Sequence, residues 1–171
     1  MSATLGFKEY RAKSLTYNAA SDVTLQDELG ILRMEIDPTL GLYVYRQVKL
    51  HASSAVGANG TPVGFSDVYH TTVTTDFQAG ISNRNLPAGV CVGTLTAGNI
   101  GYVQCGGYHA AVISNGDNDV ARGDNVILAG VDGQVDSVAA GTASTYKVLG
   151  ICVTDDAASA VPTQLCCSWL A

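Results

Sequence analysis

The sequence predicts an all-β protein, folded as a single antiparallel β-sandwich or barrel. Short apolar segments rich in β-branched residues and tyrosine follow one another from residue 88 onward. Turns containing glycine separate these segments at intervals of about eight to twelve residues, a spacing typical of sandwiches and barrels. No stretch of helical length and period lies between them, which argues against alternating strands and helices.

The chain opens with a segment of a different character. Residues 1–26 carry Phe7, Tyr10 and Tyr17 among polar neighbours, without a clean strand or helix period. We predict an extended N-terminal arm over this segment and an all-β domain over residues 27–171.

A β-hairpin follows the arm. Alternation of apolar and polar residues predicts strands over residues 31–36 and 42–50, joined by the turn Asp37-Pro38-Thr39-Leu40-Gly41, in which proline suits a type I turn. One face of the first strand holds Leu32, Met34 and Ile36, and one face of the second holds Leu42, Val44, Val48 and Leu50. A long loop of small residues is expected over residues 52–64, and a further strand over residues 65–75.

The second half supplies the remaining strands. Asn-Gly-Asp at 115–117, Arg-Gly-Asp at 122–124 and Asp132-Gly133 are sequences typical of tight turns. The strand-length segments between the turns are residues 90–95, 100–105, 108–113, 126–129, 134–138, 147–153 and 164–169.

Composition and charge limit the partners that the chain can have. Only 14% of its 171 residues are charged, against roughly 25% in an average soluble protein, and a surface so poor in charge is typical of one that partners cover. The net charge is −6, and residues 86–171 carry two basic and seven acidic side chains. Such a surface repels a phosphate backbone, so we expect no nucleic-acid partner.

We also expect no membrane partner and no secretory signal, because no apolar run approaches the roughly 18 residues of a membrane span and the first residues lack a leader pattern. The five cysteines, an odd number, do not suit a disulfide framework. We predict that they pack as small hydrophobic residues in a chain made in a reducing cytoplasm.

Two groups of residues carry a weak chemical signal. Cys105 and His109, with Cys91 and Cys152, could supply four zinc ligands, but no Cys-x-x-Cys pair makes the pattern specific. As a nucleophile and base, Cys105 and His109 lack an orienting third residue and an oxyanion loop. We therefore predict no catalytic residue, no metal site and no cofactor.

The acidic segment at residues 115–124 resembles a calcium loop only in part, because the pattern fails at Ala121 and no glutamate closes it. A solvated hairpin tip explains these residues better. The tripeptide Arg122-Gly123-Asp124 likewise reads as the turn that precedes a strand.

Four segments of the second half follow one another in a recognisable order: the run from Ala88 to Gly107 (AGVCVGTLTAGNIGYVQCGG), the Gly-Asp turn within residues 120–126, the Gly-x-Val hairpin at 132–136 and the segment 147–153. This succession resembles the head decoration (cement) proteins of tailed bacteriophages. It implies a virion protein that binds the major capsid protein on the outer surface of the head, present in many copies and often trimeric. It implies no enzymatic activity.

The arm is the predicted capsid contact, because interfaces favour aromatic and cationic side chains. The residues predicted to make it are Phe7, Lys8, Tyr10, Arg11, Lys13 and Tyr17. Two alternatives stay open: another virion part, such as a tail, baseplate or fibre subunit, and a trimeric all-β nucleotide hydrolase, for which the substrate motifs are missing.

Overall fold

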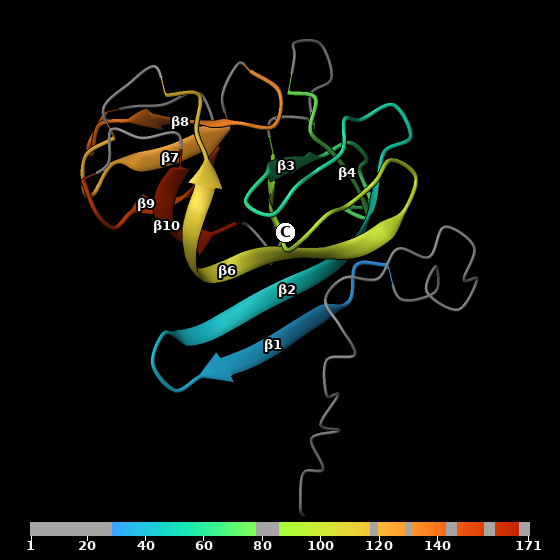
Figure 1. Ribbon diagram of the computed structural model, residues 1–171, viewed down its shortest axis with the longest axis horizontal. Coiled ribbons are helices and arrows are strands. Elements are labelled where there is room, and N and C mark those ends of the chain that lie inside the picture. The colour runs from blue at the N-terminus through green and yellow to red at the C-terminus, as the bar shows by residue number, and fades with distance from the viewer. Residues whose placement is uncertain are drawn as a thin grey trace, which may run out of the picture.

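The computed structural model describes residues 29–77, 86–116, 120–128, 131–142, 147–155 and 160–167. The described residues form ten strands and no helix, which confirms the all-β prediction (Figure 1). The strands are β1 (Leu32–Asp37), β2 (Gly41–Leu50), β3 (Pro62–Phe65), β4 (Thr72–Thr74), β5 (Pro87–Cys91), β6 (Ile100–Ile113), β7 (Asn125–Leu128), β8 (Val135–Val138), β9 (Val148–Cys152) and β10 (Ala160–Cys166).

The strands belong to one continuous sheet, in the order β1-β2-β4-β3-β5-β6-β10-β9-β7-β8. All pairings of named strands are antiparallel except that of β2 with β4, which is parallel. The sheet is therefore mixed, and the antiparallel prediction holds for every pair but this one.

Two closures turn this sheet into two rings. Strand β2 also pairs with β6, so β2, β4, β3, β5 and β6 close on themselves. A parallel bridge between Ser114, just after β6, and Val135 of β8 closes β6, β10, β9, β7 and β8 in the same way. A closed ring leaves no open strand edge within it.

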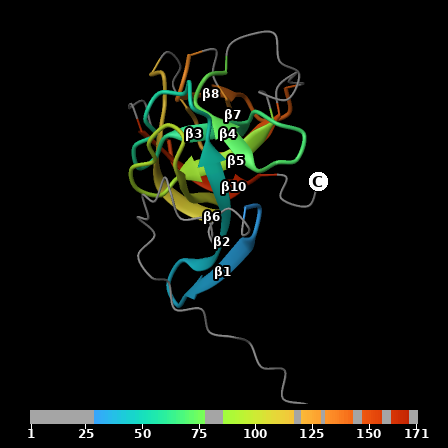
Figure 2. The same ribbon diagram turned by 90° about the vertical axis from the view of Figure 1, so that its right-hand side faces the viewer.

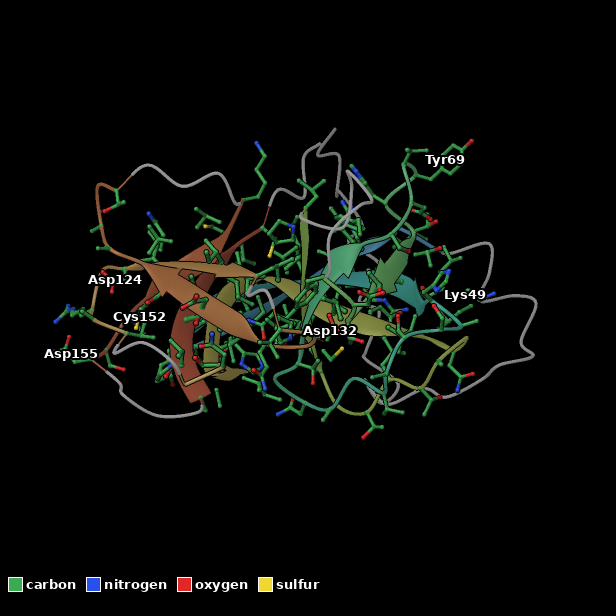
Figure 3. The ribbon with its side chains drawn as sticks, turned by 90° about the horizontal axis from the view of Figure 1, so that it is seen from above. Lys49, Tyr69, Asp124, Asp132, Cys152 and Asp155 are labelled. Atoms are coloured by element: carbon green, nitrogen blue, oxygen red, sulfur yellow. The ribbon has the colours of Figure 1, made fainter. Side chains whose placement is uncertain are left out.

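The buried apolar side chains form two hydrophobic cores, one for each ring, although Val44 of β2 and Val90 of β5 belong to the second core. The first contains Val48, Leu50, Val63, Phe65, Val73, Ala88, Cys91, Leu95 and Val103. The second contains Val44, Val90, Cys105, Val112, Val120, Val126, Val135, Leu149, Cys152, Val161, Leu165 and Cys167. The rings are also tied through the β7–β8 turn, where Asp132 accepts a hydrogen bond from the Phe77 N–H at 2.9 Å (Figure 3).

Strand β6 is shared by both rings and runs through the middle of the molecule (Figure 1). The sequence predicts two strands here, over residues 100–105 and 108–113, but they are one strand of 14 residues. At the join, Gly107 has φ of +91°, and a Cβ on it would lie 2.3 Å from the Leu42 carbonyl oxygen. Glycine at this position lets the strand cross β2 closely without ending.

The expected long loop over residues 52–64 is shorter than predicted, because Pro62–Phe65 forms β3. Backbone hydrogen bonds hold the remaining residues: Gly57 and Leu95 exchange two, and the Gly60 N–H donates to the Cys91 carbonyl at 3.0 Å. The lack of a side chain at Gly60 lets the backbone of Ala111 come close, since a Cβ on Gly60 would lie 2.3 Å from the Ala111 carbonyl oxygen.

Candidate functional site

The β1–β2 hairpin projects from the body of the protein (Figures 1 and 2). Half of the large hydrophobic residues that the described chain exposes lie in this hairpin or directly before it: Ile31, Met34, Ile36, Leu40 and Leu42. Ile36 is 83% exposed and Met34 58%. Contiguous exposed apolar residues on a folded protein are typical of an interaction surface. We call Met34, Ile36, Leu40 and Leu42 the hairpin patch.

The hairpin patch continues the face of β2 that forms the core. Val44 belongs to the second core and Leu32 packs against it, whereas Met34, directly opposite Val44, lies largely outside. Alternation keeps Ile36 and Leu42, the next pair along the hairpin, on the same face. The alternating apolar side chains of the hairpin therefore continue beyond the residues that the second core buries.

The predicted turn fixes the tip of the hairpin. The Asp37 carboxylate accepts hydrogen bonds from the N–H groups of Thr39 at 2.7 Å and Leu40 at 2.8 Å. Gly41 then takes φ of +92° and pairs with Asp37. This side-chain turn holds the register that places Ile36 opposite Leu42, which confirms the predicted hairpin.

The opposite face of the hairpin is aromatic and charged. The rings of Tyr43 and Tyr45 stack with centroids 6.2 Å apart, and the Arg33 guanidinium lies 4.7 Å from the centre of the Tyr102 ring. Burial, and then the nearby charge of Glu35, raise the pKa of Tyr45 to about 12. The phenol therefore stays neutral at physiological pH, and this face combines aromatic surface with both acidic and basic side chains.

A second exposed apolar position lies in the loop between β3 and β4, where Val68 and Tyr69 are largely exposed. Figure 3 shows Tyr69 at the rim of the molecule, pointing away from the body. The Asp67 carboxylate organises the loop by accepting hydrogen bonds from the Thr71 N–H, the Thr71 hydroxyl and the Thr72 N–H. The loop therefore presents Tyr69 on a fixed backbone.

The arm residues predicted to contact a capsid, Phe7, Lys8, Tyr10, Arg11, Lys13 and Tyr17, lie outside the described residues, as does the arm itself. Among the described residues, we take the hairpin patch as the candidate interaction surface. The sequence already indicated which hairpin side chains share a face. It held no signal that this face extends beyond the core.

Cys105 and His109 are both buried in β6, with the Gly106-Gly107 bend between them. The Cys105 thiol donates to the Val44 carbonyl at 3.4 Å, and burial raises its pKa to about 11. His109 accepts from the Ala111 N–H at 3.3 Å, and burial lowers its pKa. Both side chains therefore hydrogen-bond to backbone groups of the fold, which fits the packing role that the sequence favoured.

The four hypothetical zinc ligands do not converge. Cys91 lies in the first core, whereas Cys105 and Cys152 lie in the second. Within the described ranges, no three His, Cys, Asp or Glu residues are placed to hold a metal ion. All five cysteines are free thiols. Four are buried as predicted, but Cys166 is exposed, because it ends β10 between the buried Leu165 and Cys167 and points to the opposite face.

In the described part of the acidic segment at residues 115–124, backbone N–H groups donate to carboxylates and organise a turn. Asp124 accepts hydrogen bonds from the N–H groups of Ala121 and Ala140, and Asp155 accepts from the Arg122 N–H at 2.8 Å. Asp124 and Asp155 lie at the end of the molecule opposite Tyr69 (Figure 3). Gly123 has φ of +95°, as expected of the turn that leads into β7.

Comparison of the chain with models of protein families, with curated proteins and with solved structures gives no match. In the part of the chain that the structure describes, no helix has the length and apolar character needed to cross a bilayer.

Proposed function

We propose that the chain is a capsid decoration protein of a tailed bacteriophage, which binds the outer surface of the head and strengthens the contacts between capsomers. The observation that carries the proposal is the hairpin patch, a projecting apolar surface on a body closed into two rings. The resemblance of residues 88–153 to decoration proteins supplies the partner, the major capsid protein.

The architecture suits this function physically. A body closed into rings resists deformation, because strand hydrogen bonds must break together before it changes shape. A fully buried leucine, isoleucine or methionine contributes roughly 1.5–3 kcal/mol to an interface. Several such side chains per copy, repeated over a capsid, add up to firm attachment without a large contact area per copy. The arm residues Phe7, Lys8, Tyr10, Arg11, Lys13 and Tyr17 are the second proposed contact.

The test is sedimentation of the full chain with capsids of its phage that lack it. We expect saturable binding at hundreds of copies per particle. Ile36→Ser combined with Leu42→Ser should weaken binding at least about tenfold, since two apolar contacts are lost. The matched control is Ile151→Ser, which changes an exposed isoleucine in the second ring, and it should bind as the natural chain does.

Deletion of residues 1–17 tests the arm separately. Loss of binding on deletion assigns the anchor to the arm, and retained binding with loss in the hairpin variant assigns it to the hairpin patch. Absence of saturable binding by the natural chain would overturn the proposal. A copy number of a few per particle would point instead to a tail, baseplate or fibre subunit.

A further inference from the structure

The outer edge of β1 is open among the described residues. Strand β1 lies at one end of the sheet order and outside both rings, and its named partner is β2. The other terminal strand, β8, is bridged to the end of β6 at Val135. An open edge presents unpaired N–H and C=O groups, to which another strand can add.

The backbone groups on the open edge belong to apolar residues. Gln47 of β2 exchanges hydrogen bonds with Gly30 and Ile31, and the Ile31 carbonyl points toward β2. Backbone groups alternate sides along a strand, so those of Leu32, Met34 and Ile36 point to the open edge. The register from Leu32 to Asp37 is unbroken, and neither proline nor lysine interrupts it. Neither a proline nor a break in register therefore protects the open edge of β1.

The sequence of β1 is complementary to itself. If two β1 strands pair antiparallel around Met34, Arg33 of each lies opposite Glu35 of the other on one face. Leu32 then lies opposite Ile36 of the second copy on the other face. Both pairings are favourable across strands, and each occurs twice. A shift of two residues places Glu35 opposite Glu35 and Leu32 opposite Pro38, which has no N–H to donate, so one register is preferred.

The positions of both charges in the single chain suit this pairing. Arg33 carries its charge on the tyrosine face of the hairpin, over Tyr102. Glu35 is two residues along and lies on the same face, close enough to act on Tyr45. A guanidinium has five N–H donors and can therefore bind more than one partner at a time, a carboxylate among them.

We propose that two copies of the chain join through their β1 strands, paired antiparallel about a twofold axis at Met34. The pairing makes a continuous β2-β1-β1-β2 ribbon and brings two hairpin patches onto one face. This inference goes beyond the proposed function and does not depend on it. It differs from the trimer that the family resemblance implies, because an isologous contact of this kind closes with two copies.

The contact is small, so we expect a dimer that dissociates on dilution. Sedimentation equilibrium of the full chain from micromolar to submillimolar concentration should show the mass rising from one chain to two. Arg33→Glu and Glu35→Arg should each weaken dimerisation about tenfold, because like charges then meet twice across the axis. An equimolar mixture of the two variants should recover the dimer, since the two acidic side chains of one variant then face the two basic side chains of the other.

Recovery in the mixture also shows that both variants fold. A mass that stays at one chain throughout the range, or that rises to three, would overturn the proposal. So would single variants that dimerise as the natural chain does, because the contact would then lie elsewhere. Capsid binding is measured separately, with the hairpin-patch variants, so either proposal can fail without the other.

Discussion

Met34 and Val44 lie directly opposite each other in the β1–β2 hairpin, yet Met34 is 58% exposed and Val44 is 4% exposed. This single pair marks where the second core ends and the hairpin patch begins. Two side chains of similar hydrophobicity, on the same face and next to each other, therefore carry different roles. Val44 holds the fold together, and Met34 is available for a partner.

The first prediction compares these two residues. Val44→Ala should lower the free energy of unfolding by about 2 kcal/mol, because it removes two methyl groups from a packed core. Met34→Ala should change it by less than about 0.5 kcal/mol, as is usual at exposed positions. Urea unfolding at a dilution where light scattering shows one chain measures both. Equal losses of unfolding free energy in the two variants would contradict the boundary between the second core and the hairpin patch.

The second prediction concerns the bend in β6. Gly107→Ala should destabilise the protein by at least about 2 kcal/mol, since a Cβ there would meet the Leu42 carbonyl oxygen in addition to the strain of positive φ. Gly98→Ala is the control: Gly98 has φ of +78° with nothing within 4 Å of its Cβ position. It should cost only the strain, about 1 kcal/mol. Thermal unfolding of both variants checks the difference.

The third prediction is a loss of stability in alkali. Burial raises the pKa of the Cys91 thiol from 9.0 to about 12 in the folded protein. Above pH 9.0 the unfolded chain loses this proton and the folded chain keeps it, so stability falls as the pH rises toward 12. The expected slope is up to ~1.4 kcal/mol per pH unit for each such thiol.

Urea titrations across this range should show a shallower slope for Cys91→Ala than for the natural chain. Val90→Ala is the control, because it truncates a fully buried neighbour of Cys91 that has no titratable group, and it should keep the slope of the natural chain. An unchanged slope in Cys91→Ala would exclude Cys91 as the source of the alkaline loss.

The fourth prediction is a loss of stability in acid from the Tyr69 loop. Burial alone raises the pKa of Asp67, but hydrogen bonds from Thr71 and Thr72 outweigh it and hold the pKa below its usual value of 3.8. A lowered pKa adds stability above 3.8, and this contribution disappears as the pH falls through the folded-state pKa. Asp67→Asn should therefore lose less stability than the natural chain between about pH 5 and pH 2.

Thr71→Val isolates one of these bonds, because it removes the hydroxyl that donates to Asp67 at 2.8 Å and keeps the shape of the side chain. It should show an intermediate dependence on acid. If Asp67→Asn and the natural chain lose stability in parallel, the hydrogen bonds to Asp67 are not the source.

The hairpin was predictable because all of its determinants are local. Alternation from Ile31 to Leu50 set the two strands, and the Asp37-Pro38 turn set their register. The bend in β6 was not predictable in the same way. Gly106-Gly107 looks like a break between two strands in the sequence, and the backbone of Leu42, far away along the chain, makes it a bend within one strand.

The sequence by itself determined the strand succession, the glycine turns and the set of side chains that share each face of the hairpin, since these follow from a period of two and from local backbone preferences. Only the tertiary structure decided that the strands close into two rings sharing β6, and that Met34 and Ile36 lie beyond the core. The physical reason is that burial depends on which distant strands pair. A residue's neighbours along the chain do not fix that pairing.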